Sequence, residues 1–212
     1  MFSLAIDRAR KLNQDVSRLL LRGRVWRALH GSGVSIVSSN CLGGRLSRLA
    51  REPYRSPTVG LWFRPDDFIK FATEISRYVE AELTHEVQES ASLGYPVGRL
   101  ADIKVLFMHY PSFAEARDHW IKRAARIDMR KLLLVFTDRD NATIDHLTQF
   151  DKLPYSKLLF VSRDDLNLAS AICVRDGNEK DQVGDLTSQW HHLAPVLTRS
   201  ILRRIRQELN SD

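Results

Sequence analysis

The sequence predicts an α/β protein with a three-layer α/β/α fold and a mostly parallel central sheet of about five or six strands. Short apolar segments rich in β-branched residues recur along the chain, which is the pattern of buried strands. Segments with apolar residues at helical spacing separate them, and such alternation is typical of a parallel sheet covered on both faces. Basic amphipathic helices are predicted at both ends. We therefore expect a helical extension at residues 1–30 and a single α/β domain over residues 31–212.

The N-terminal helix is predicted over residues 3–29, and Gly31 and Gly33 then end it. Its apolar residues recur at steps of three, four or seven, so we expect one apolar stripe that packs on the core. The stripe consists of Ala5, Ala9, Leu12, Val16, Leu19 and Trp26.

A strand is predicted over residues 34–39, where apolar and polar residues alternate. A turn at 40–44 and a short helix over 45–51 follow, and residues 57–63 form the second predicted strand. The next helix is predicted from Pro65 to about Leu83, because proline and the two aspartates after it favour a helix start.

Residues 85–98 are predicted to be largely loop, and residues 102–110 to be a third strand. Ser112 and Glu115 have the spacing of a capping box, which predicts a helix through Arg126. A fourth strand over residues 131–137 is continuously apolar, which is typical of a central position in the sheet.

Asp140 or Asn141 is predicted to cap a helix that ends at Phe150. Two further strands are predicted over residues 157–162 and 169–175. The chain closes with a helix from His192 to about Leu209.

The composition indicates an ordinary globular protein, with 212 residues, 43% apolar and 27% charged. No apolar run approaches the ~20 residues that a membrane span needs, and we expect no signal peptide. The two cysteines cannot form a disulfide scaffold, so we expect free thiols and a cytoplasmic location. The chain has no Walker loop, no Gly-x-Gly-x-x-Gly and no Gly-x-Ser-x-Gly, which disfavours ordinary ATPases, Rossmann dehydrogenases and standard α/β-hydrolases.

Most of the net charge of +6 lies in the N-terminal helix, where residues 1–27 carry seven Arg/Lys and two Asp. A nucleic-acid-binding protein would carry a basic stripe across its main fold, so we expect no nucleic-acid partner. The basic helix suits an anionic membrane surface or an acidic partner, with a solvated helix face as the alternative. We expect any membrane contact to be peripheral, at the inner face, and the amphipathic helices at the two ends also offer surfaces for a homodimer.

Ligands of parallel sheets bind beyond the carboxyl ends of the strands. Cys41 follows the first strand at a helix start, where the helix dipole favours a reactive thiolate, and the sequence makes it the candidate nucleophile. His109 is the candidate base, with Asp138 or Asp67 to orient it. The alternative is that Cys41 and His109 are structural residues of the interior.

Asp138 and Asp140 form an Asp-x-Asp triplet directly after the central strand. Carboxylates in this arrangement hold a divalent metal against a diphosphate in many nucleotide-sugar glycosyltransferases. The sequence thus gives a second candidate chemistry, with a divalent metal as the cofactor. The alternative for Asp140 is a helix cap.

Six motifs occur in an order and spacing that resemble the bacterial domain-of-unknown-function family 1919: Ser38–Gly44, Ser56–Leu61, Asp67–Phe71, Tyr95–Gly98, His109–Tyr110 and Phe150–Tyr155. Members of that family are often labelled exopolysaccharide or capsule biosynthesis proteins, so the resemblance implies an α/β/α fold and work on a sugar or nucleotide sugar. Candidate substrate-binding residues within these motifs are Asn40, Gly43, Gly44, Asp67, Lys70 and Tyr110.

Three functional hypotheses follow. The first is a cytoplasmic, transferase-like enzyme of polysaccharide biosynthesis that acts on a sugar or nucleotide-sugar substrate, either through Cys41 or through metal-bound Asp138 and Asp140. The second is a non-catalytic carbohydrate- or partner-binding module of the assembly machinery. The third is a papain-like Cys/His hydrolase.

Overall fold

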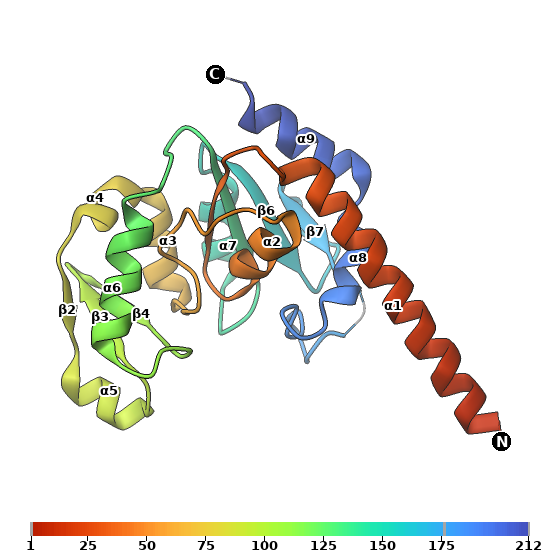
Figure 1. Ribbon diagram of the computed structural model, residues 1–212, viewed down its shortest axis with the longest axis horizontal. Coiled ribbons are helices and arrows are strands. Elements are labelled where there is room, and N and C mark those ends of the chain that lie inside the picture. The colour runs from red at the N-terminus through yellow and green to blue at the C-terminus, as the bar shows by residue number, and fades with distance from the viewer. Residues whose placement is uncertain (1, 176, 212) are drawn as a thin grey trace.

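The computed structural model describes residues 2–175 and 177–211, apart from the side chains of residues 2–5 and 10. Its centre is a parallel sheet in the order β1-β5-β6-β7 (Figure 1). The strands run over Ser35–Ser38, Leu132–Thr137, Ser156–Val161 and Ala171–Cys173. The predicted α/β class is therefore confirmed, while the described central sheet has four strands where five or six were expected.

Strand β5 occupies an inner position because both of its faces are apolar. All six of its residues are buried, and it pairs with β1 through Leu134 and Val37 and with β6 through Val135 and Leu158. A strand covered on both faces has no polar side to turn to water. The continuous apolar run in the sequence thus identified its place in the sheet.

Two predicted strands of the central sheet are wrong. Residues 57–63 form an irregular segment with a bend at Gly60, and only Trp62 pairs in it, through an isolated bridge to Leu106. Residues 102–110 contribute β4 (Ile103–Leu106) to a separate antiparallel sheet in the order β2-β3-β4.

The predicted loop at 85–98 contains a helix and one end of each of the other two strands of that sheet. These strands are β2 (Leu83–His85) and β3 (Val97–Leu100), with α5 (Val87–Leu93) between them. Ala101 has φ of 50°, so the chain reverses between β3 and β4 in a two-residue turn. β4 therefore pairs within a local hairpin, and not in the central sheet to which the alternation of strands and helices had assigned it.

Helices cover both faces of the central sheet (Figure 1). On one face lie α1 (Phe2–Leu29), α2 (Leu42–Ala50), α8 (Leu193–Val196) and α9 (Arg199–Leu209). On the other lie α3 (Pro65–Thr73), α4 (Ile75–Glu80), α6 (Phe113–Ala124), α7 (Ile144–Asp151) and the antiparallel sheet. The three-layer arrangement follows from these two separate apolar cores.

Three predicted helix boundaries are wrong for local reasons. The helix expected from Pro65 to Leu83 breaks at Glu74, which has φ of −128° and separates α3 from α4. The C-terminal helix divides into the 3-10 turn η1 (Trp190–His192), α8 and α9, and the Thr198 hydroxyl caps α9. Asp140 and Asn141 both have positive φ, so neither caps α7; Thr143 does.

The predicted apolar stripe of α1 faces away from the core. Leu12 is 66% exposed, Leu19 69% and Trp26 41%, and Ala9 and Val16 are also exposed, whereas the side chain of Ala5 lies outside the described residues. The helix is held to the molecule by its opposite side, through Leu21, Val25, Ala28 and Leu29. The helix has apolar residues on two sides. The periodicity of the sequence identified the longer row, which is exposed, and not the row that packs on the core. None of the described helices combines the length and apolarity needed to cross a membrane.

Candidate functional site at the carboxyl edge of the sheet

A cavity of about 390 Å³ opens where β1 and β5 end. It is lined by residues from six separate segments of the chain, among them Asn40, Cys41, Trp62, Tyr95, Met108, His109, Thr137, Arg139, Asp140, Asp185 and Thr187. This is the edge at which parallel sheets bind ligands. The structure thus brings together four of the predicted site residues: Asn40, Cys41, His109 and Asp140.

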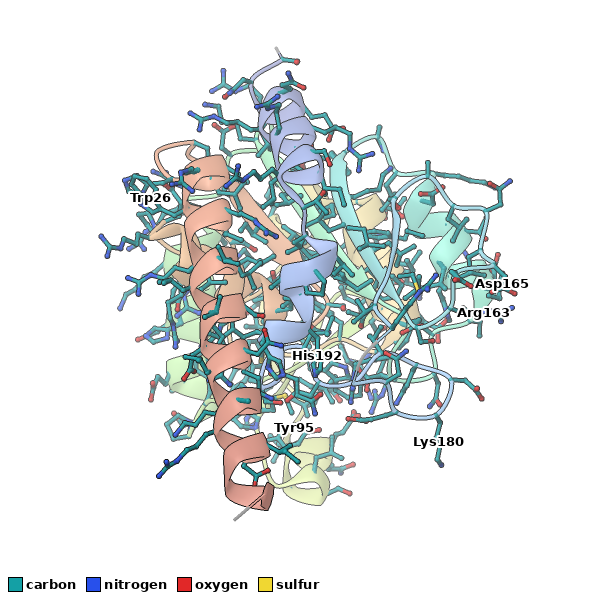
Figure 2. All side chains as sticks on the ribbon, turned by 90° about the vertical axis from the view of Figure 1, so that its right-hand side faces the viewer. Trp26, Tyr95, Arg163, Asp165, Lys180 and His192 are labelled. Carbon is teal, nitrogen blue, oxygen red and sulfur yellow. The ribbon has the colours of Figure 1, made fainter. Side chains whose placement is uncertain are left out.

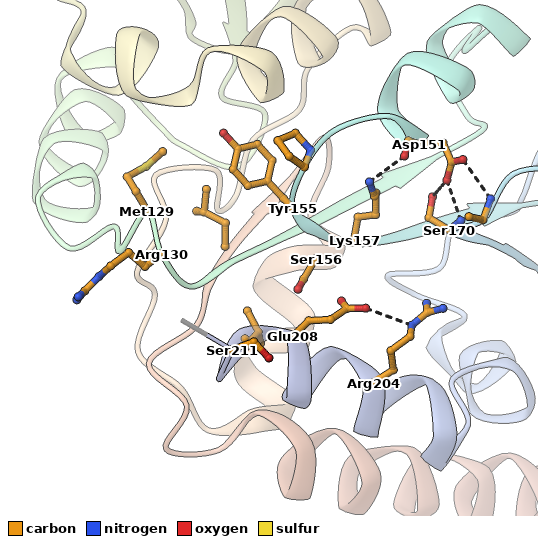
Figure 3. A pocket seen from close by; sticks show the side chains of 14 residues that line it. Met129, Arg130, Asp151, Tyr155, Ser156, Lys157, Ser170, Arg204, Glu208 and Ser211 are labelled. Atoms are coloured by element: carbon orange, nitrogen blue, oxygen red, sulfur yellow. Dashed lines mark hydrogen bonds and ion pairs between the residues drawn. The ribbon is translucent and has the colours of Figure 1, made fainter.

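A second cavity of about 680 Å³ lies at the opposite end of the strands, near α9 (Figure 3). Polar groups that line this cavity form hydrogen bonds with other parts of the chain. Lys157 donates to the backbone carbonyl oxygens of Asp151 and Leu153, and the Asp151 carboxylate accepts from the amide and hydroxyl of Ser170. With these groups satisfied by the chain itself, the cavity at the carboxyl edge is the stronger candidate for chemistry.

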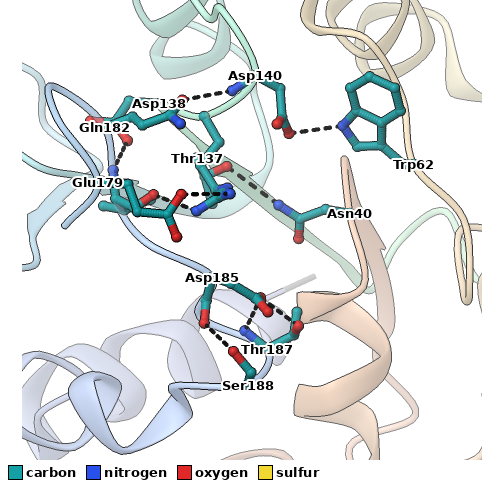
Figure 4. A network of polar contacts seen from close by, with 12 residues as sticks. Asn40, Trp62, Thr137, Asp138, Asp140, Glu179, Gln182, Asp185, Thr187 and Ser188 are labelled. Carbon is teal, nitrogen blue, oxygen red and sulfur yellow. Dashed lines mark hydrogen bonds and ion pairs between the residues drawn. The ribbon is translucent and has the colours of Figure 1, made fainter. Parts of the chain in front are cut away.

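Asn40 lines the carboxyl-edge cavity and lies between the ends of β1 and β5 (Figure 4). Its Oδ1 accepts from the amide of Leu42 at 3.0 Å, which caps the start of α2, and its Nδ2 donates to Thr137 Oγ1 at 3.3 Å. The side chain therefore ties the two strands together at their exits. Its orientation is fixed before any ligand binds.

Cys41 lies at the N-cap position of α2, as the sequence predicted, but its thiol is not activated. Burial, and secondly the negative charge of Asp185, raise the pKa of Cys41 to about 11. The expected lowering of this pKa is therefore wrong in direction. Desolvation outweighs the helix dipole at this position, and the thiol is neutral at pH 7.

His109 lines the same cavity from the loop after β4. Its side chain is exposed, and no hydrogen bond joins it to Cys41 or to another residue in the part of the chain that the structure describes. The predicted nucleophile and base thus share a cavity without the contact that a Cys/His pair requires.

Asp138 is buried, and its carboxylate is occupied by the protein. It accepts from the Ser162 amide at 2.6 Å, the Ser162 hydroxyl at 2.7 Å and the Val183 amide at 2.8 Å. These contacts join the loop after β5 to the loop after β6 and to the segment before α8. The arrangement gives Asp138 a structural role, and it does not line the cavity.

Asp140 points the other way from Asp138 and accepts from the indole Nε1 of Trp62 at 2.8 Å (Figure 4). The two carboxylates of the Asp-x-Asp triplet therefore do not converge on one point. Among the described residues, no group of three or more His, Cys, Asp or Glu side chains is arranged to hold a metal ion. The geometry gives no support to metal binding by Asp138 and Asp140 as a pair.

Asp185 is a cavity carboxylate that the sequence analysis did not identify. Burial acts to raise its pKa, but hydrogen bonds from Thr187 and Ser188 outweigh that effect and lower the pKa below its usual value. The Thr187 amide and hydroxyl donate to Oδ1 at 2.8 and 2.5 Å. Asp185 is therefore ionised at neutral pH beside a neutral Cys41.

Gly43 and Gly44 allow α2 to pack closely against its neighbours. A Cβ on Gly43 would lie 2.7 Å from the Ser38 Cβ, and one on Gly44 would lie 3.1 Å from Val59 Cγ1. Both glycines are buried and lie outside the cavity lining. They let α2 approach β1 and the irregular segment at residues 57–63, which sets the position of Cys41.

The remaining predicted binding residues lie away from the cavity. Lys70 donates to Asp102 Oδ2 at 3.1 Å on the surface of α3. Asp67 stands in the first turn of the same helix, where burial raises its pKa. Tyr110 packs its ring on Gly60 and donates to the Val59 carbonyl at 2.8 Å, a structural contact.

The aromatic residues of the cavity could have been identified from the sequence. Tyr95 begins one of the quoted motifs, and Trp62 directly follows another. No residue of those two motifs was assigned to the site, because the assignments fell on the other motifs and strand exits. Asp185 and Thr187 lie in a segment without periodicity or motif, so no signal in the sequence identified them.

The fold and the site together define a class: a parallel α/β protein with an aromatic- and carboxylate-lined cavity at the carboxyl edge of its sheet. The chain belongs to the family described as domain of unknown function (DUF1919), which it matches over residues 14–196. It is 33% identical over 170 residues to an uncharacterized protein of Haemophilus influenzae, covering 80% of this chain and 81% of that protein. The predicted family resemblance is confirmed.

Proposed function

We propose that the protein is a cytoplasmic, transferase-like enzyme of exopolysaccharide or capsule biosynthesis that binds a sugar in the carboxyl-edge cavity. The observation that carries this proposal is the pairing of aromatic rings with fixed polar groups in one cavity: Trp62 and Tyr95 beside Asn40, Asp140 and Asp185. The link to polysaccharide assembly rests on the label that family members carry. The cytoplasmic location is supported by two unpaired cysteines.

The lining suits a sugar because a pyranose has two kinds of surface. Its axial C–H groups form an apolar patch that fits against an aromatic ring, and its hydroxyls need acceptors and donors at the rim. Trp62 supplies a ring whose polar N–H is already bonded to Asp140. Asp140, Asp185 and Thr187 supply oxygen atoms around it.

The charges of the cavity favour the neutral part of the substrate. Arg139 is the permanently cationic side chain among the lining residues, and it donates to the Val183 carbonyl at 2.8 Å and pairs with Glu179 at 3.3 Å. A diphosphate would have to displace these contacts. We therefore assign the cavity to the sugar, with any nucleotide portion outside it.

Asp185 is the residue that we assign to proton transfer. Its pKa is held below the usual value, so its carboxylate is free of a proton at pH 7. It would accept the proton of an acceptor hydroxyl as that oxygen attacks the anomeric carbon, and the leaving group would depart with the bonding electron pair. Cys41, neutral beside it, lines the cavity without acting as nucleophile.

A second candidate function is a binding module. The raised pKa of Cys41 fits this module as well as it fits the transferase, since neither uses an activated thiol. The module would use the same cavity to hold a carbohydrate without turnover. The papain-like alternative requires an ionised Cys41 in contact with His109, and the geometry does not support it.

The test incubates the full chain with UDP-glucose, UDP-N-acetylglucosamine or GDP-mannose and oligosaccharide acceptors, and follows transfer by mass spectrometry. The Asp185→Asn substitution should slow transfer by about a hundredfold or more, since a positioned base contributes that much. Arg130→Ala, at the other cavity, is the matched control and should leave the rate unchanged. Sugar binding without transfer would favour the binding module. Transfer that Asp185→Asn does not affect, or the absence of both binding and transfer, would overturn the proposal.

A further inference from the structure

The outer face of α1 is an apolar row without a partner in the described part of the chain. Its exposed members are Leu12, Val16, Leu19, Leu20 and Trp26. Residues on the opposite side of the helix, Leu21 and Val25, anchor it to the core, so the row is turned away from the molecule. Figure 2 shows Trp26 on the edge of α1 remote from α9.

Basic residues border this row. Arg8 lies one turn before Leu12 and Arg22 one turn after Leu19, and both arginines are exposed. Over residues 1–27 the sequence carries seven basic and two acidic residues, a net charge of +5. An apolar row bordered by cations is the pattern of helices that lie in the interface of a membrane.

The row leads into a shallow groove between α1 and the end of α2. The groove has a volume of about 240 Å³ and is lined by Leu19, Gly23, Trp26, Arg22 and Arg51. Two guanidinium groups stand beside an apolar floor there. This combination fits a phosphate group whose attached acyl chain covers the apolar side chains.

We propose that α1 binds the protein peripherally to the surface of a bilayer that contains anionic phospholipid, with its axis in the plane of the interface. From Leu12 to Trp26 the row extends about 21 Å along the helix, and the first half of α1 projects clear of the other elements (Figure 1). A second copy of the chain is disfavoured as the occupant, because pairing two such faces would bring the two sets of arginines together. The proposal is independent of the reaction in the carboxyl-edge cavity.

The test is co-sedimentation of the full chain with vesicles of phosphatidylcholine alone or of phosphatidylcholine mixed with phosphatidylglycerol. Binding is expected to the mixed vesicles, and to fall by at least about tenfold when phosphatidylglycerol is left out or salt is raised. The double variant Leu12→Gln/Leu19→Gln should lower the partition coefficient by about tenfold or more, because it removes apolar groups that insert. Glutamine is a good helix former and both leucines are exposed, so the thermal midpoint should not change.

Two further variants separate charge from folding. Arg8→Gln/Arg22→Gln should weaken binding to the mixed vesicles by at least about tenfold, since each basic side chain near an anionic surface contributes about fivefold. Ile121→Gln/Ile144→Gln, at similarly exposed positions on α6 and α7, is the control and should bind as the wild type does. The proposal is overturned if mixed vesicles do not bind the protein, or if the leucine and control variants behave alike. It is also overturned if the leucine variant only converts a dimer to a monomer in analytical ultracentrifugation.

Discussion

The indole Nε1 of Trp62 donates a 2.8 Å hydrogen bond to Asp140 Oδ2, across 78 positions of sequence. This bond joins the irregular segment before α3 to the loop after β5. It also sets the ring and the carboxylate at a fixed angle in the cavity that we assign to the sugar. The relationship between these two residues is the basis of the first prediction.

Trp62→Phe should cost about 1 kcal/mol or more of the free energy of unfolding, because one hydrogen bond is lost and a smaller aromatic ring replaces the indole. Sugar affinity should fall by about tenfold, since Asp140 loses the contact that orients it. Isothermal calorimetry and urea unfolding measure the two effects. Trp120→Phe is the control, because the Trp120 Nε1 has no hydrogen-bond partner among the described residues. Unchanged sugar affinity in Trp62→Phe would count against the site.

Asp138→Asn should destabilise the protein by about 2–4 kcal/mol, because its carboxylate is buried and accepts three hydrogen bonds. Asparagine has one acceptor oxygen, and its amide group would face the N–H donors of Ser162 or Val183. Urea unfolding measures the loss, with the exposed Asp118→Asn as control. A variant with wild-type stability and no activity would instead assign Asp138 to catalysis or metal binding.

Gly43→Ala should destabilise the protein by about 1–3 kcal/mol, because the added Cβ would meet the Ser38 Cβ at 2.7 Å. Gly23→Ala, on α1, should stabilise it by about 0.5–1 kcal/mol, because its nearest neighbour there is the flexible end of Arg27 at 3.6 Å. Thermal unfolding of the two variants checks the pair. A neutral Gly43→Ala would mean that α2 does not need its close approach to β1.

Cys41 should react with iodoacetamide only at high pH. Its pKa of about 11 lies above the ~8.5 of a free thiol. The neutral thiol is favoured in the folded state, so its contribution to stability is present below about pH 8.5 and is lost as the pH rises toward 11.

Peptide mass spectrometry follows the labelling rate against pH, with Cys173 as the internal reference. The free energy of unfolding of the wild type should also fall, relative to that of Cys41→Ala, over the same pH range. Rapid labelling of Cys41 that levels off below pH 8 would restore the activated nucleophile.

The fold could be predicted where local pattern and tertiary environment agree. β5 and the last four residues of β6 are continuous apolar runs because the sheet buries both of their faces. Residues 57–63 and 102–110 are also rich in apolar residues, but their pairing is decided by the bridge between Trp62 and Leu106 and by the hairpin at Ala101. Composition indicates that a segment favours strand structure, but it does not specify which strand that segment pairs with.

The site could be predicted in part for a similar reason. The rule that ligands bind at strand exits identified Asn40, Cys41, His109 and Asp140 correctly as neighbours. The same rule could not tell that the Asp138 carboxylate turns toward Ser162, because that depends on a loop 24 residues away. The direction of the Cys41 pKa shift likewise depends on the burial of the thiol and on Asp185, which is far from Cys41 in the sequence.

The central claim is that the carboxyl-edge cavity binds a sugar. The most direct test follows the indole N–H signals in a proton–nitrogen NMR spectrum, of which there should be four, since the chain has four tryptophans. Each signal is assigned by a Trp→Phe substitution, and the sugars glucose, galactose, N-acetylglucosamine and mannose are added in turn. Trp62 lines the cavity, whereas Trp26, Trp120 and Trp190 do not. The account predicts that one of these sugars shifts the Trp62 signal and leaves the other three in place. A sugar that shifts another tryptophan while the Trp62 signal stays fixed, or a spectrum that no sugar changes, would contradict it.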